Sequence, residues 1–209
     1  MKTLLAIIIL LCCFSCSSQD FEGIISYKTT YTSKIDGVSA TEMFGQEVAY
    51  DTTYFKNGFF LNKSSTDFMN YLLWRSEDKK QYFKNKYSAD TIWFDQTDSR
   101  PSQIDSFLVQ KKAETVGVYD CDLLLVYKND RLYKYYYNPD FKLDPSYYQQ
   151  YTNSSKFEIM KIMNSPYLRL HIISPRDEVD MVCTNLEVTK LSDETFAIPK
   201  EGNLIKFEY

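Results

Sequence analysis

The sequence predicts a mainly β protein whose curved antiparallel sheet of roughly eight to eleven strands forms an incomplete barrel with one or two short helices. Aromatic residues are abundant, with 18 Tyr and 14 Phe, and they favour the half-buried, pleated surface of a sheet. Glycine and proline are few, with six of each. Several short stretches alternate apolar and polar residues and are separated by turn signals, which is typical of antiparallel sheets and partial barrels.

The first half of the chain contains one clear strand and one clear hairpin. Residues 21–31 alternate a mostly apolar face with a mostly polar face, which predicts the first strand. Residues 52–61 predict a hairpin because Asn57 and Gly58 both tolerate a positive φ and form the preferred two-residue turn. Three more short strands are expected over residues 71–74, 81–86 and 91–94, with turns at 77–80 and 88–90.

The second half contains the strongest hairpin signal, over residues 111–137 with a turn at 128–130. The last two strands are expected over residues 167–173 and 178–189. Two stretches do not resemble strands. Residues 102–109 are expected to form a short helix, and residues 145–163 one or two helical turns that end before Asn164.

Residues 1–15 have the features of a signal peptide. Lys2 precedes an apolar run over residues 4–14, which is shorter than the roughly 20 residues that span a bilayer. Two cleavage sites stay open. Cleavage before Cys16 would give a lipoprotein acylated at Cys16, with residues 16–20 as a tether. Cleavage after Ser18 would give a soluble periplasmic protein. Residues 21–209 are expected to form a single β-rich domain at the outer membrane.

Composition and motifs argue against several functions. The net charge is −4 and no basic stripe occurs, so we expect no nucleic-acid partner. The only histidine, His171, lies on no metal-ligand spacing and is interpreted as a partly exposed strand residue. No nucleophile, phosphate-loop or metalloprotease motif is present. We therefore expect no metal, no cofactor and no enzymatic activity.

Two cysteines, Cys121 and Cys183, lie in the expected folded domain. Each occupies an apolar strand face, and an oxidising envelope permits a disulfide between them. They could equally be two buried, unpaired thiols, because spacing in the sequence does not determine distance in space. Both alternatives stay open, and the hypothesis is a disulfide between Cys121 and Cys183.

Three passages carry a resemblance to known proteins: F-E-G-I-I-S-Y-K at 21–28, the hairpin formed by 114–127 and 133–140, and L-E-V-T-K-L-S-D-E-T-F-A-I-P at 186–199. They resemble a family of exported Gram-negative proteins that is related to the GLPGLI family and to proteins with the fold of the lipoprotein carriers LolA and LolB. The resemblance implies a curved, LolA-like antiparallel sheet wrapped over one or two helices. It implies no catalytic residues.

Two functions follow as hypotheses. The first is an envelope lipoprotein that binds a lipid or another apolar ligand without catalysis, in the concave face of its sheet. Phe157, Met160 and Met163 would cover that face, because methionine adapts to ligands of varied shape. They could instead fill the sheet as core. The second function is an accessory lipoprotein that contacts another envelope protein through its Tyr-rich surface around residues 133–137, although cross-strand packing is the simpler interpretation of those tyrosines.

Overall fold

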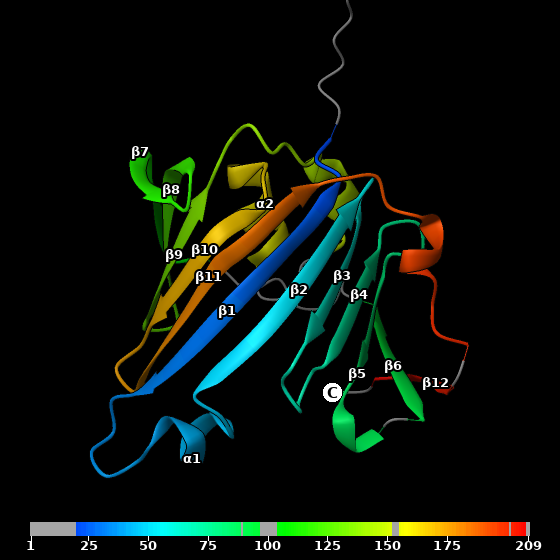
Figure 1. Cartoon of the computed structure of the whole chain (residues 1–209), viewed down its shortest axis with the longest axis horizontal. Coiled ribbons are helices and arrows are strands. Elements are labelled where there is room, and N and C mark those ends of the chain that lie inside the picture. The colour runs from blue at the N-terminus through cyan, green and yellow to red at the C-terminus, as the bar shows by residue number, and fades with distance from the viewer. Residues whose placement is uncertain (1–19, 89, 97–103, 152–154, 201, 208–209) are drawn as a thin grey trace, which may run out of the picture.

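The computed structural model describes residues 20–88, 90–96, 104–151, 155–200 and 202–207. The predicted signal peptide and Cys16 lie outside these residues. The described strands form one twelve-stranded sheet in the order β12-β6-β5-β4-β3-β2-β1-β11-β10-β9-β8-β7 (Figure 1). The predicted fold class, a curved and mainly antiparallel sheet with short helices, is confirmed.

The strands are β1 (Gly23–Ser33), β2 (Val48–Lys56), β3 (Phe59–Ser64), β4 (Tyr71–Arg75), β5 (Lys80–Lys84), β6 (Thr91–Gln96), β7 (Ser106–Val116), β8 (Tyr119–Lys128), β9 (Arg131–Tyr137), β10 (Tyr167–Ile173), β11 (Asp177–Val188) and β12 (Asn203–Lys206). The helical elements are α1 (Ala40–Phe44), η2 (Lys86–Ser88), η4 (Pro145–Tyr148), α2 (Lys156–Met163) and η6 (Asp193–Phe196).

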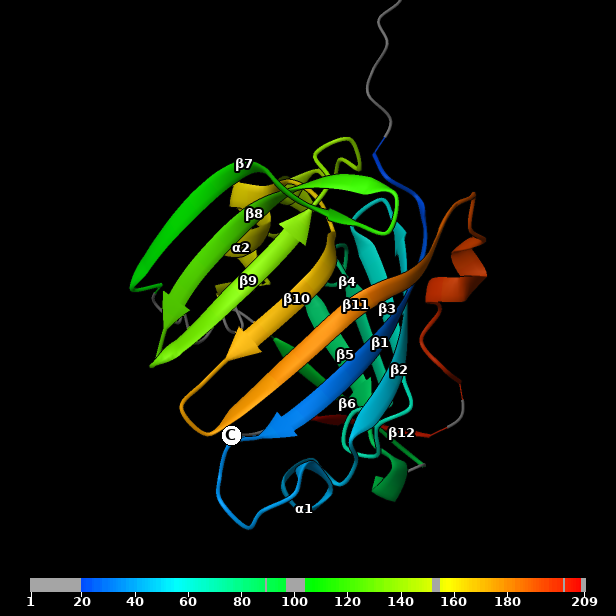
Figure 2. The same cartoon turned by 60° about the vertical axis from the view of Figure 1, so that its left-hand side comes forward.

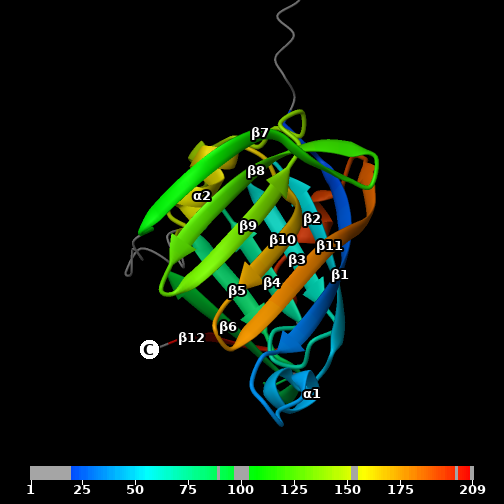
Figure 3. The same cartoon turned by 90° about the vertical axis from the view of Figure 1, so that its left-hand side faces the viewer.

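Most strands that are neighbours in the sheet are also consecutive in the sequence. β1 lies in the middle, where it pairs with β2 on one side and with β11 on the other, both antiparallel. Among the described strands, only β12 pairs in parallel, with β6. The sheet curls from β7 across β11 and β1 towards β6, with α2 on its inner side (Figures 2 and 3). We call this inner side the concave face.

The residue types at the turns predicted the positions of the turns correctly. Asn57 and Gly58 form the turn between β2 and β3 with φ values of 44° and 80°, as predicted. Asn129 and Asp130 turn β8 into β9, also with positive φ. The predicted helical turns at 145–163 are confirmed as η4 and α2, and α2 ends at Asn164 in the left-handed conformation.

Two expectations were wrong, and one helix was missed. Residues 106–109 belong to β7 rather than to a helix, because Phe107–Gln110 pair with Leu123–Val126 of the apolar strand β8. The twelve strands exceed the eight to eleven expected, since the short β12 was missed. The small helix α1 was missed as well, although Ser39 and Glu42 form a capping box at its start.

Two of the buried clusters lie on opposite faces of the sheet. On the concave face α2 buries Ile159 and Met163 against the side chains Leu124, Val126, Tyr135 and Tyr137 of β8 and β9. On the opposite, convex face, η6 packs Phe196 onto β3–β6, against Leu61, Leu73, Tyr82 and Ile92. The C-terminal segment therefore covers the outside of the sheet there, and the helical segment between β9 and β10 covers part of the inside.

Candidate functional site

An aromatic cluster fills the concave face where η4 approaches β3 and β4. The Tyr151 ring lies tilted, with its centroid 4.9 Å from that of Trp74 and 5.4 Å from that of Phe60, and the Tyr148 ring stacks on Phe60 at 6.4 Å. Trp74 and Tyr148 are fully buried, and within the described part of the chain neither Trp74 Nε1 nor the Tyr148 hydroxyl has a hydrogen-bond partner. Burial raises the pKa of Tyr148, and so does the nearby Asp20 carboxylate. This part of the concave face is closed.

The centre of the concave face is less filled. Three partly exposed residues lie opposite one another on neighbouring strands: Ile172 of β10, Val179 of β11 and Tyr31 of β1. Leu170 and Met181 continue this surface one step along β10 and β11. We call these five residues the apolar strip. Ile172 and Val179 belong to none of the buried clusters described above, so the interior is only partly packed here.

A polar patch lies beside the apolar strip, on β1–β3. The Thr29 hydroxyl donates to the Asp51 carboxylate at 2.9 Å, and the Asn62 amide donates to the Thr53 hydroxyl at 3.0 Å. Thr29, Asp51 and Thr53 are buried. Because buried polar groups are costly without partners, these bonds fix a polar region within the concave face. The face therefore offers an apolar region and a polar region side by side.

The predicted cover residues occupy different environments. Met163 is 3% exposed and packs with Ile159 under α2, so it fills the core. Met160 is partly exposed and packs against two clusters, the one formed by Ile159 and Met163 and the one that includes Trp74 and Tyr151. Phe157 is partly exposed and packs against the second of these clusters. Ile159, which sequence reasoning omitted, is a main apolar contact of α2. A helical period through Ile159 and Met163 could have revealed it.

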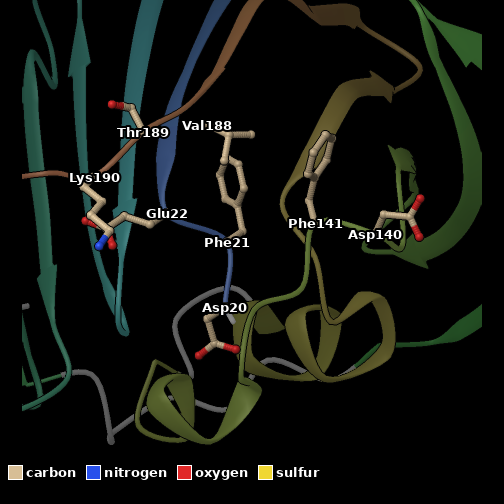
Figure 4. Close-up of a pocket in the computed structure, with 8 residues that line it drawn as sticks. All are labelled: Asp20, Phe21, Glu22, Asp140, Phe141, Val188, Thr189 and Lys190. Carbon is tan, nitrogen blue, oxygen red and sulfur yellow. The ribbon is translucent and has the colours of Figure 1, made fainter. Parts of the chain in front are cut away.

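A separate pocket of about 470 Å³ lies where the chain enters β1 (Figure 4). Its apolar wall consists of Phe21, Phe141 and Val188, and the two phenylalanine rings are 5.3 Å apart. Its polar rim consists of Asp20, Glu22, Asp140, Thr189 and Lys190. Burial raises the pKa of Asp20, with a further contribution from Asp144. Sequence reasoning missed this pocket because Phe21, Phe141 and Val188 are far apart in the chain.

The two cysteines are free thiols, so the predicted disulfide is wrong. Cys121 lies on β8 and Cys183 on β11, and β9 and β10 run between them. Strands are about 4.8 Å apart, which places the two α-carbons on the order of 14 Å apart. A disulfide needs about 7 Å or less. Cys121 is buried and Cys183 is partly buried, and burial raises the pKa of Cys121 to about 11.

The remaining candidate residues make ordinary structural contacts. His171 Nε2 lies 3.6 Å from the Glu178 carboxylate on a partly exposed strand position. The tyrosines Tyr135, Tyr136, Tyr137, Tyr148 and Tyr151 are buried, which favours the packing interpretation of the Tyr-rich stretch, whereas Tyr133 is partly exposed and Tyr147 is exposed. Within the described ranges no three His, Cys, Asp or Glu side chains gather in a way that could hold a metal ion. No helix in the same ranges is long and apolar enough to cross a membrane.

Comparison with solved structures identifies proteins with a similar chain path. PNGF-II matches with a TM-score of 0.50 and 10% identity, over 90% of this chain and 31% of that one. The LolA superfamily protein NE2245 from Nitrosomonas europaea matches with a TM-score of 0.40 and 10% identity, over 86% and 91% of the two chains. LprF from Mycobacterium bovis matches with a TM-score of 0.35 and 8% identity, over 84% and 90%.

These similarities concern the fold. The chain spans about a third of the length of the PNGF-II chain that it matches. No protein-family model matches the sequence, and no curated protein does. The class that the structure defines is therefore a curved, mainly antiparallel sheet with a partly filled concave face.

Proposed function

We propose that this protein is an exported envelope lipoprotein, anchored through Cys16, that binds a lipid or another amphiphilic ligand on its concave face without catalysis. The observation that carries the proposal is the position of Ile172 and Val179. These two apolar side chains face each other on the concave face and stay partly exposed, whereas Trp74, Tyr148 and Tyr151 of the aromatic cluster are buried. A partly exposed apolar surface inside a curved sheet favours an apolar occupant.

The polar patch narrows the ligand class. The bonded pairs of Thr29 with Asp51 and of Thr53 with Asn62 lie beside the apolar strip. A purely hydrocarbon ligand would leave this polar patch facing an apolar surface, which is unfavourable. A molecule with an apolar tail and a hydrogen-bonding head would match both regions. The relation to GLPGLI proteins, the signal peptide and the position at the outer membrane stay predictions under this proposal.

Two measurements test the proposal. The first is intact mass spectrometry of the protein purified from membranes. Acylation at Cys16 would add lipid mass to a chain that begins at Cys16, whereas a chain that begins at Gln19 without lipid would contradict the anchor. The second is organic-solvent extraction of the purified protein followed by mass spectrometry of the extract. We expect a stoichiometric amphiphile, and a reproducibly empty extract would contradict ligand binding on the concave face.

A further inference from the structure

The pocket at the start of β1 is a second apolar site, and it shares no lining residue with the apolar strip. Its wall combines the buried ring of Phe21 with the partly exposed ring of Phe141 and with Val188, which is 67% exposed. The backbone holds this wall in place, because the Phe21 N–H donates to the Lys142 carbonyl at 2.6 Å. A preformed cavity of about 470 Å³ beside an uncovered valine is within the usual size of small-ligand sites.

The charges at the rim select among apolar ligands. Glu22 is already engaged, because its carboxylate accepts from the Leu191 N–H at 2.6 Å and lies 3.6 Å from Lys56 Nζ. Asp20 and Asp140 contribute two more carboxylates, against the single ammonium of Lys190. A free fatty acid would bring another negative charge to this rim, which is unfavourable. An acyl chain in a neutral ester or amide avoids that repulsion, and its carbonyl can accept from Lys190.

The pocket lies at the root of the predicted tether. Asp20, Phe21 and Glu22 line it (Figure 4), and Cys16 precedes Asp20 in the sequence by only a few residues. Four extended residues reach at most about 14 Å. An acyl chain attached to Cys16 can therefore reach the pocket without any rearrangement of the described fold.

We propose that this pocket binds one neutral, ester- or amide-linked acyl chain. Two sources of this chemistry exist: the acyl group on Cys16 of the same molecule, or a free lipid. The first source rests on the proposed lipidation, whereas the pocket itself does not. The site shields an acyl chain from water beside the first strand, at a place that contains none of the residues of the apolar strip.

The test uses the Cys16→Ser protein, which cannot be acylated, and a monoacylglycerol that carries a pyrene-labelled decanoyl chain. Val188→Lys replaces an apolar wall residue of the pocket with a charged side chain. Because this removes apolar contact area for the acyl chain and the ammonium must lose part of its hydration when the probe binds, the affinity for the probe should fall at least about tenfold. Val118→Lys is the matched control. Val118 is 85% exposed and does not line the pocket, so this variant should bind the probe as the Cys16→Ser protein does.

Three comparisons complete the experiment. Ile172→Glu alters only the apolar strip, so it should leave the affinity of the pocket for the probe unchanged. The pocket proposal and the concave-face proposal are therefore tested independently. Equal affinities of the Val188→Lys and Val118→Lys variants, with both folded by circular dichroism, would overturn the pocket. Weaker probe binding by acylated wild type than by the Cys16→Ser protein supports the pocket with Cys16 as the source. Equal binding supports it with free lipid as the source.

Discussion

Ile172 of β10 lies directly opposite Val179 of β11 on the concave face, and both side chains are partly exposed. The next residue, Ile173, is also partly exposed but points to the convex face. The two isoleucines therefore form a matched pair, with the same residue type, the same strand and opposite faces. Comparing substitutions at these two positions distinguishes an effect on ligand binding from an effect on the stability of the strand.

Ile172→Glu should reduce ligand binding and Ile173→Glu should not. A carboxylate on the concave face would have to be buried beside the ligand tail, which should weaken binding at least about tenfold. The measurement is the amount of amphiphile recovered from each purified variant by extraction and mass spectrometry. If the two variants retain equal amounts, the concave face is not the ligand site.

Met163→Ala should destabilise the fold much more than Met160→Ala. Met163 is 3% exposed and packs with Ile159 against β8 and β9, so its truncation leaves a cavity that costs about 2–5 kcal/mol. Met160 is only partly buried, and its surroundings can adjust more easily. Urea denaturation of the ligand-free proteins measures both costs. Similar losses would show that the two methionines belong to one packed core and that α2 is not a partial cover.

Asp122→Asn should destabilise the protein at neutral pH. The Asp122 carboxylate is buried and accepts from Lys111 Nζ at 2.7 Å and from the Lys112 N–H at 2.9 Å, which fixes an irregular turn in β7. Lost hydrogen bonds to a buried charge cost about 1–3 kcal/mol. Asp120→Asn is the control, because exposed Asp120 accepts only from the Thr115 hydroxyl among the side-chain bonds described. We expect a smaller loss there.

The Asp122 effect should also depend on pH. Burial disfavours the charged carboxylate, but the hydrogen bonds from Lys111 and Lys112 outweigh burial and hold the pKa of Asp122 below its usual 3.8. The folded protein therefore binds this proton more weakly than the unfolded chain. The stabilisation is complete above pH 3.8 and is lost as pH falls through the lower folded-state pKa. In urea titrations, the difference in stability between wild type and Asp122→Asn should therefore be smaller at pH 3 than at pH 7.

The sequence was informative where one short segment determines the structure. The Asn57-Gly58 turn and the alternation that begins at Phe21 depend on neighbouring residues alone, so both were predicted correctly. Phe107 was misassigned because its strand depends on pairing with β8. The separation of Cys121 from Cys183 depends on the strand order, which no local pattern contains. The exposure of Ile172 depends on how far α2 reaches across the sheet, and Phe21 meets Phe141 only in the folded chain.

Both domain cysteines should be recovered as free thiols. Unfolding the Cys16→Ser protein without reductant should expose Cys121 and Cys183 to iodoacetamide, and peptide mass spectrometry should find both labelled. In the folded protein Cys121 should react far more slowly, because it is fully buried and its pKa of about 11 leaves little thiolate at neutral pH. A disulfide-linked peptide pair would contradict the strand order between β8 and β11.

Gly58→Ala should destabilise the protein more than Gly37→Ala. Both glycines have left-handed backbones, with φ values of 80° and 75°, so each alanine costs about 1–2 kcal/mol for its conformation. A Cβ on Gly58 would also lie 2.5 Å from Cβ and Cγ of Tyr147 in η4, whereas a Cβ on Gly37 meets nothing within 4 Å. Since these Tyr147 atoms adjoin its backbone, η4 itself must shift, and overpacking typically costs a further 1–3 kcal/mol or so.

The difference between the two glycine variants measures how firmly the β2–β3 hairpin holds η4 over the aromatic cluster. Urea denaturation gives the free energy of unfolding of each variant. Subtracting the Gly37→Ala loss from the Gly58→Ala loss removes the backbone cost that both variants share. A Gly58→Ala loss that exceeds it by about 1 kcal/mol or more would show that η4 is clamped against the hairpin. Equal losses would show that η4 moves away at no cost, and the closed end of the concave face would then be open to ligands as well.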